Sequence, residues 1–270
     1  MKSEGQKAIP PVIERIEMKF TIPFSMVEPI SEFASIYCSP DKYSIQSDDG
    51  YYMVNSLYFD SPEFLFVRMR MARVQNRFNI RVRSYGNHPS MPYFLELKQK
   101  KGHIIRKYRA MLSDPDWFKV YTEPGFSSII ESDNPVEIRN SKLIERLIHS
   151  YDATPKVLTQ YNRKAWVSDV DEYGRVTFDM ELKYAPENDY NVAPIDDAMV
   201  SCDPETVFDP DCSVVLELKC YSAFVPLWMI DLIKCFDLQR RSFSKYLTGV
   251  REVLGLNVYS SASTVPSIGI

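Results

Sequence analysis

The sequence predicts an α+β fold in which about eight antiparallel strands close around a polar interior, with helices on the outside. Charged residues stand two apart on segments that otherwise have the composition of β-strands. Side chains alternate between the two faces of a strand, so each charged set lies on one face and apolar residues on the other. One such strand is typical of a sheet wetted on one face, whereas six indicate a polar interior inside an apolar shell. The six sets are Arg15-Ile16-Glu17-Met18-Lys19, Arg81-Val82-Arg83, Glu96-Leu97-Lys98, Tyr161-Asn162-Arg163, Asp179-Met180-Glu181 and Glu217-Leu218-Lys219.

The first half of the chain is predicted to form a tail, residues 1–11, and then an antiparallel meander. Ser25 and Glu28 have the spacing of a capping box, which predicts a short helix after them. Lys101-Gly102-His103 predicts a tight hairpin. In chain order we expect strands at Val12–Ile22, Tyr51–Phe59, Arg77–Tyr85, Tyr93–Lys100 and Ile104–Met111, with a helical crossover at Glu63–Val74.

The second half repeats this combination of strands and helices. Apolar residues near helical spacing predict a helix over Glu137–Tyr151, after a Pro-, Asp- and Ser-rich stretch. A Pro- and Asp-rich connection at Lys183–Cys212 gives no clear pattern. Two amphipathic helices are expected after Pro226, separated near Asp237–Arg241. The expected strands are Lys156–Ser168, Arg175–Leu182 and Ser213–Tyr221. The prediction is one domain over residues 12–255 with a second flexible tail at 256–270. The closed interior of about eight strands is either filled by side chains or just holds a small ligand.

Composition excludes several classes of function. The net charge of -4 argues against a general nucleic-acid binder, although residues 60–110 carry twelve Lys or Arg and three Asp or Glu. Neither a secretion signal nor an apolar run long enough to span a membrane is visible. The five cysteines include no CxxC pair and are expected to be reduced thiols in a cytoplasmic protein. No GxGxxG turn or GxxxxGK[ST] loop occurs, so any phosphate must be held by side chains.

Basic side chains are the first candidates for a binding site. Arg81 and Arg83, with Arg77 on the same face, form a row of cations that taken alone is more typical of a solvated sheet face. Further cations at inward-eligible positions change this interpretation, because Arg and Lys together suit a multiply charged phosphate chain. These are Lys19, Lys98, Lys107, Arg109, Arg163 and Lys219.

Acidic side chains alternate onto the same faces. One interpretation is that they are counter-ions, because paired charges are how charge becomes buried. The other is that some bind Mg²⁺ or Mn²⁺, which take carboxylate oxygens and share their coordination shell with substrate phosphates. The carboxylates are Glu17, Glu96, Asp179, Glu181 and Glu217.

Several spaced motifs resemble, in this order, the catalytic domain of the vacuolar transporter chaperone (VTC) family. That family belongs to the triphosphate tunnel metalloenzymes, so the resemblance implies an antiparallel eight-stranded β-tunnel that makes inorganic polyphosphate from ATP. It extends from about Glu14 to Val250. The motifs are Glu17-Met-Lys-Phe20, Ser56-Leu-Tyr-Phe-Asp60, Ile80-Arg-Val-Arg-Ser-Tyr-Gly86, Leu95-Glu-Leu-Lys98, Tyr161-Asn-Arg163, Val176-Thr-Phe-Asp179, Leu216-Glu-Leu-Lys219 and Phe243-Ser-Lys-Tyr246.

The resemblance implies roles for individual residues. Tyr161 and Ser244 would add hydrogen bonds to the substrate, and Glu217 would hold the metal ion. The segment Glu14–Lys19 departs from the ExExK pattern of the superfamily's hydrolases and cyclases, which makes those activities less favoured. Two alternatives stay open: a triphosphate or polyphosphate hydrolase that uses Glu96 or Asp179 to place a water, and a binding module without turnover. The implied phosphate ligands are Lys19, Arg81, Arg83, Lys98, Lys107, Arg163 and Lys245.

Overall fold

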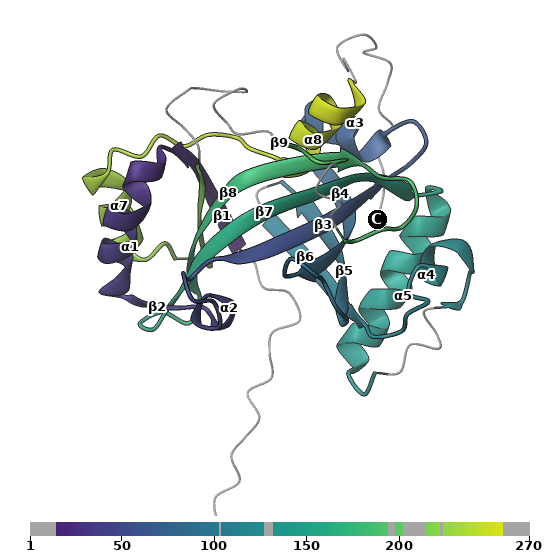
Figure 1. Ribbon diagram of the computed structural model, residues 1–270, viewed down its shortest axis with the longest axis horizontal. Helices are drawn as coiled ribbons and strands as arrows, with labels where there is room; N and C mark the ends of the chain where they lie inside the picture. Colours follow the sequence, from purple (N-terminus) through teal and green to yellow (C-terminus); the bar gives the residue numbers. More distant parts are fainter. Residues whose placement is uncertain are drawn as a thin grey trace, which may run out of the picture.

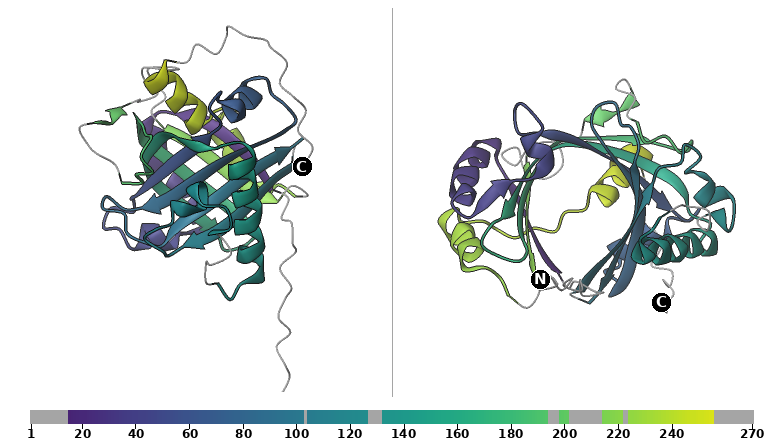
Figure 2. Two further views of the ribbon diagram at one scale, coloured as in Figure 1. Left: turned by 90° about the vertical axis from the view of Figure 1, so that its right-hand side faces the viewer. Right: turned by 90° about the horizontal axis from the view of Figure 1, so that it is seen from below.

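Eight antiparallel strands form a closed ring in the computed structural model (Figures 1 and 2). The order around the ring is β7-β3-β4-β5-β6-β1-β10-β8, and β8 pairs back with β7 to close it. The structure describes residues 15–102, 104–126, 132–193, 198–201, 214–221 and 224–255. The predicted α+β fold is therefore confirmed. The ring strands are β1 (Arg15–Ile22), β3 (Tyr52–Asp60), β4 (Asn76–Tyr85), β5 (Tyr93–Lys101), β6 (Ile104–Leu112), β7 (Thr154–Ser168), β8 (Gly174–Pro186) and β10 (Val214–Tyr221).

Alternation along each strand places charge inside the ring and apolar groups outside. On β4, Ile80 and Val82 are fully buried in an outer core, while Arg81 and Arg83 lie on the opposite face. On β10, Leu216 and Leu218 are likewise buried outside and Glu217 lies inside. Burying the outer face stabilises the ring, at roughly 1.5–3 kcal/mol for each large apolar side chain.

Helices cover two sides of the ring (Figure 1). On one side, the short 3₁₀ helix η1 (Phe24–Met26) and the helices α1 (Val27–Ser35) and α7 (Leu227–Cys235) lie over β1, β8 and β10. On the other side, α4 (Lys119–Thr122) and α5 (Pro135–Ser150) lie over β3 to β6. No helix in the described part of the chain is both long and apolar enough to cross a membrane.

Two helices lie at one mouth of the ring, at the top of Figure 1: α3 (Leu65–Met71) and α8 (Lys245–Leu254). The segment that joins α7 to α8 crosses this mouth, as the right-hand view of Figure 2 shows. It pairs with β1, because the Arg241 backbone N–H donates to the Lys19 carbonyl over 2.8 Å. Among the described residues only one pair, Arg15 with Ile105, joins β1 to β6, so this segment supports the ring near its least connected seam.

Most predicted elements are confirmed within a few residues, but the sequence did not reveal several short ones, among them η1 and α4. β2 (Cys38–Pro40) and β9 (Val200–Ser201) extend the sheet beyond β7 and β8, and α2 (Lys42–Ile45) follows β2. β8 extends to Pro186, so the start of the predicted connection at 183–212 is strand. Both predicted tails, residues 12–14 and Ser213 lie outside the described residues.

Two local predictions are wrong. The capping box does not form, because α1 begins at Val27 and its N-cap residue, Met26, makes no side-chain bond to the helix. Glu181 does not share the inward face of Asp179. A bulge between β7 and β8 shifts the register there, and Glu181 has a φ of 53° and an exposed side chain. Cys38, Cys220 and Cys235 are free thiols, as expected.

Candidate functional site

Glu96 is the centre of a first group of charges inside the ring. Its carboxylate is 1% exposed and accepts two hydrogen bonds from Arg81, at 2.9 Å from Nε and 2.8 Å from Nη2. Lys107 Nζ lies 2.6 Å and Arg109 Nε 3.2 Å from its other oxygen. Arg83 Nη1 lies 3.9 Å from the oxygen that Arg81 binds. These cations hold the pKa of Glu96 well below its usual range in spite of burial, which raises it. One carboxylate is therefore the counter-ion of four cations, two on β4 and two on β6.

Tyrosine hydroxyls orient the arginines of this group. Tyr58 accepts from Arg81 Nη1 over 3.0 Å, and Tyr161 accepts from Arg83 Nη2 over 3.4 Å. Tyr85 accepts from Arg109 over 3.4 Å. The Nε of Arg83 is buried and has no hydrogen-bond acceptor within the described part of the chain. The Arg83 guanidinium therefore has hydrogen-bonding capacity that the described residues do not use.

Asp179 and Glu217 form a second group on the neighbouring strands β8 and β10. Asp179 is fully buried and accepts two hydrogen bonds from Arg163, over 2.6 and 2.7 Å, and one from Lys245 over 2.6 Å. Glu217 pairs with Lys19 at 2.8 Å and Lys219 at 2.6 Å. Burial opposes ionisation of both carboxylates, but the surrounding cations lower the pKa of each.

Lys245 connects the two carboxylates from the first residue of α8. Its Nζ lies 3.9 Å from Glu217 and 4.6 Å from the centre of the Tyr161 ring. Taken alone, a helical Lys is expected to be exposed, yet this side chain is 7% exposed. Ser244 is the N-cap of α8, and its Oγ accepts from the Leu247 backbone N–H. The helix lies close to β7 and β8 because residue 249 is Gly, where a Cβ would come within 2.5 Å of Tyr184.

Asp60 ties α8 to α3 from the end of β3. It is fully buried and accepts from the backbone N–H groups of Phe66 and Val67 in α3 and from the Tyr246 hydroxyl over 2.8 Å. Burial raises the pKa of Asp60 to about 6, while these hydrogen bonds lower it. The Tyr246 ring also stacks on Tyr58, with centroids 4.8 Å apart. The position of Lys245 therefore depends on Asp60 and Tyr246.

Tyr246→Phe is expected to lower the free energy of unfolding by about 1–3 kcal/mol, because a buried carboxylate loses a partner. Burial raises the pKa of Asp60 to about 6, so its carboxyl is mostly neutral at pH 5 and mostly ionised at pH 7. The stability that the neutral form contributes is lost as pH rises through about 6. The cost of the substitution should therefore be larger at pH 7 than at pH 5, as urea unfolding at both values would measure. Tyr121→Phe is the matched control, because the buried Tyr121 hydroxyl has no partner in the described residues. Equal effects of the two substitutions would contradict this account.

Positive charge exceeds negative charge among the predicted site residues. Eight cations on the strands of the ring, with Lys245 of α8 as a ninth, accompany four carboxylates, a surplus of five positive charges. Glu17, which pairs with Lys98 at 2.5 Å, completes the set. The predicted gathering of these residues into one place is therefore what the structure contains. The interior toward α8 is apolar instead, filled by side chains that include Tyr184, Phe243 and Val250.

The crowding of cations changes the protonation of Lys107. Burial and the charges of Arg83, Arg109 and Arg81 lower its pKa to about 7, against the effect of Glu96, which raises it. A bound polyanion should raise this pKa again. We therefore expect proton uptake when tripolyphosphate binds at pH 8, and weaker binding as pH rises above 7. Titration calorimetry in two buffers of different ionisation enthalpy measures the uptake. Lys107→Met should reduce it, the exposed Lys101→Met should not, and the same uptake in both variants would refute the assignment.

The carboxylates differ in how well they fit a metal ion. Glu96 and Asp179 do not fit, because an arginine makes two hydrogen bonds to each of them and a lysine contacts each as well. Only lysines contact the other two carboxylates, Glu217 at both oxygens and Glu17 at one. Glu217 and Glu17 lie diagonally across the pairing of β1 with β10 and offer hard oxygen donors. No group of three or more His, Cys, Asp or Glu side chains in the described part of the chain is arranged to hold a metal ion. Mg²⁺ commonly uses one or two carboxylates with substrate phosphates, so Glu217 and Glu17 fit that role.

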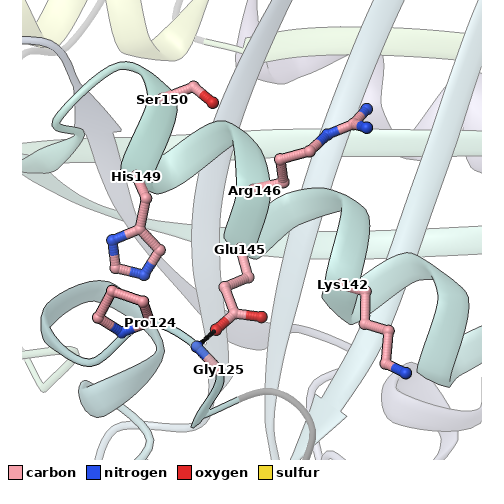
Figure 3. A pocket seen from close by; sticks show the side chains of 7 residues that line it. All are labelled: Pro124, Gly125, Lys142, Glu145, Arg146, His149 and Ser150. Atoms are coloured by element: carbon pink, nitrogen blue, oxygen red, sulfur yellow. Dashed lines mark hydrogen bonds between the residues drawn. The ribbon is translucent and has the colours of Figure 1, made fainter.

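Some site residues were not predicted as such. Tyr58 and Tyr85 were given no role from the sequence, yet their hydroxyls accept hydrogen bonds from Arg81 and Arg109. Their inward position on β3 and β4 was the available signal. A separate pocket of about 420 Å³ lies outside the ring against α5, lined by none of the charged interior residues (Figure 3). There the Gly125 backbone N–H donates to Glu145 over 2.5 Å.

Comparison with known proteins places the chain in a family. The chain is similar to subunit 4 of the vacuolar transporter chaperone complex from Trypanosoma brucei brucei, at 24% identity over 94% of this chain and 37% of that protein. The same subunit from Trypanosoma cruzi is 26% identical over 75% of this chain and 28% of that protein. The chain thus spans about a third of the length of these curated relatives.

Solved structures give weaker likenesses. A putative adenylate cyclase from Bacillus halodurans has a TM-score of 0.48 at 10% identity, covering 87% of this chain and 95% of that one. A putative adenylyl cyclase from Hippeastrum has a TM-score of 0.46 at 13% identity, covering 92% and 99%. The fold assignment rests on the strand order given above. The model of the VTC domain family matches residues 14–254, and the chain therefore belongs to the VTC domain family.

Proposed function

We propose that the protein is a metal-dependent polyphosphate polymerase that transfers the γ-phosphate of ATP to the end of a growing inorganic polyphosphate chain. The observation that supports this most is the surplus of cations, nine against four carboxylates, inside a closed ring of strands. Crowded cations without enough counter-charge favour a multiply charged anion. Membership of the VTC domain family supports the same substrate class.

The reaction needs no protein nucleophile. A terminal oxygen of the chain attacks the γ-phosphorus of ATP, the bond from that phosphorus to the β,γ-bridging oxygen breaks, and ADP leaves with that oxygen. Phosphoryl transfer is catalysed mainly by positioning and by stabilising the charge on the transferring group. Arg81 and Arg83 are the residues we assign to that charge, because their forks match phosphate oxygens and tyrosines fix their orientation.

The remaining cations lie at two sides of the ring and would bind phosphates at each. Lys19, Lys219 and Lys245 surround Glu217 and would bind phosphates at the β8–β10 side of the ring. Lys98, Lys107 and Arg109 would do so at the β5–β6 side. When bound, Mn²⁺ or Mg²⁺ held by Glu217 and Glu17 would neutralise phosphate charge at the first of these sides. Lysines that now pair with these carboxylates would then be free to contact phosphate.

The hydrolase alternative is less well supported by the charges. It needs a carboxylate that positions or deprotonates a water, and Glu96 or Asp179 was the candidate. Cations lower the pKa of both, so neither is suited to accept a proton near neutral pH. Both are instead counter-ions that keep arginines and lysines in place.

The test is synthesis of polymer by the purified protein. Incubation with ATP and Mn²⁺ or Mg²⁺ should give an acid-labile phosphate polymer that grows with time, and Glu217→Gln should prevent it. The exposed Glu32→Gln on α1 is the matched control and should leave synthesis unchanged. A protein that binds tripolyphosphate but makes no polymer with either metal would refute the polymerase and leave the binding module.

A further inference from the structure

A second group of cations lies outside the interior site, at the mouth of the ring next to α3. It consists of Arg70 in the last turn of α3, Arg77 on β4, Lys100 on β5 and Arg240 in the segment that crosses this mouth. Arg77 and Lys100 are cross-strand partners. Arg77 lies on the same face of β4 as Arg81, and Lys100 lies on the same face of β5 as Lys98, in each case nearer the mouth. We call these four residues the rim cluster.

Contacts join the segments that carry the rim cluster, and the charges of three of its members act on the fourth, Lys100. Arg70 Nη2 donates to Ser242 Oγ over 3.0 Å, which joins α3 to the crossing segment, and Arg240 pairs with Phe20 of β1. Arg77 Nη1 donates to the Val74 carbonyl over 2.6 Å. Burial lowers the pKa of Lys100, and the charges of Arg77, Arg70 and Arg240 lower it further. The rim cluster is therefore one electrostatic unit built from four segments.

The rim cluster differs from the interior site in having no counter-charge. Inside the ring four carboxylates pair with the cations. None of the four rim cations forms an ion pair with any Asp or Glu in the described part of the chain. Four converging cations without acidic partners raise the local concentration of anions. A ligand that already carries several charges would relieve their repulsion.

We propose that the rim cluster binds phosphate units of a polyphosphate chain that extends beyond the interior site, an inference that rests on the proposed function. A linear polyphosphate carries charge along its whole length, so one chain could contact the interior cations and the rim cluster together. Arginine forks match its oxygens and Lys100 adds a point charge. A triphosphate held by the interior residues is too short to need the rim. The rim cluster thus gives long chains more affinity than short ones, through an effective-concentration gain.

The experiment compares a short and a long ligand on one variant. Arg70→Gln/Lys100→Gln/Arg240→Gln should bind tripolyphosphate like the unchanged protein, and should bind long-chain polyphosphate at least about tenfold more weakly at low salt. The slope of log affinity against log salt should become shallower by about two for the long chain only. The matched control is Arg139→Gln/Lys142→Gln/Arg146→Gln on the exposed face of α5, partly visible in Figure 3, which removes the same charge elsewhere.

Each outcome decides a different claim. Unchanged affinity for the long chain, an equal loss in the control variant, or an equal loss for both ligands would overturn the rim site. Single-stranded RNA is a second long polyanion for this comparison. If the triple variant bound RNA more weakly but bound long-chain polyphosphate as before, the rim site for polyphosphate would also be overturned. If the unchanged protein binds neither phosphate ligand, the proposed function fails instead. If the triple variant does not melt cooperatively, Arg240→Gln alone replaces it, because Arg240 is exposed. This single variant should also bind long-chain polyphosphate more weakly and tripolyphosphate unchanged, with a smaller loss.

Discussion

Replacing Glu96 with glutamine is expected to lower the free energy of unfolding by about 3–5 kcal/mol, the usual cost of removing one partner from a buried ion pair. Four cations would remain around a neutral amide, and the carboxylate they lose is 1% exposed. The cations lower the pKa of Glu96, so the stability it contributes is present above its unfolded pKa and is lost only in strong acid. Chemical unfolding at pH 7 measures the difference.

Tripolyphosphate should partly reverse this loss. An anion that binds the folded state stabilises it by mass action, and here it also supplies the negative charge that the substitution removed. The increase in melting temperature on adding tripolyphosphate should therefore be larger for Glu96→Gln than for the unchanged protein. Glu32→Gln on α1 is the control and should behave like the unchanged protein. A Glu96→Gln variant of unaltered stability would contradict the assignment of Glu96 as the counter-ion of this group.

Arg81→Ala is expected to reduce polymer synthesis about 10³-fold while the protein still melts cooperatively. The loss follows from removing a charged fork from the transferring phosphate, an effect of about this size in phosphoryl-transfer enzymes. The fold should persist, because Glu96 keeps Lys107 and Arg109 as partners and the repulsion between Arg81 and Arg83 disappears.

The measurement is the initial rate at saturating ATP together with a thermal melt. Arg139→Ala, exposed on α5, is the matched control for lost positive charge. Arg81→Lys separates charge from geometry, since Lys cannot reproduce the two hydrogen bonds to one carboxylate that Arg81 makes. Retention of more than about a tenth of the rate in Arg81→Ala would contradict its assignment to the transferring group.

The fold could be predicted because alternation is a local property. Residues two apart share a face wherever the strand is regular, so Arg81 with Arg83, and Glu217 with Lys219, could be placed inside from sequence alone. Alternation did not place Glu181 correctly, because a bulge between β7 and β8 turns its side chain outward. No residue type in the sequence predicts that bulge. The same limit applies to β2 and α2, which are too short to have a period.

The roles of the carboxylates could not be predicted, because they depend on neighbours that are distant in sequence. Glu96 is a counter-ion because the register of β5 with β6 places Arg109 opposite it and Lys107 diagonally. Lys245 is buried because Gly249 lets α8 approach β7 and β8 and because Asp60 binds Tyr246. The rim cluster needed the same three-dimensional information, since its members lie 170 residues apart at the extremes.

The central claim is that the γ-phosphate is passed to a chain and not to water. The most direct measurement is therefore the balance of products from γ-labelled ATP in the presence of Mn²⁺ or Mg²⁺. The account predicts one ADP for each phosphate added to acid-labile polymer, with orthophosphate a minor product. Release of one orthophosphate for each ADP, with no label in polymer, would contradict it and identify the protein as a hydrolase of the same fold.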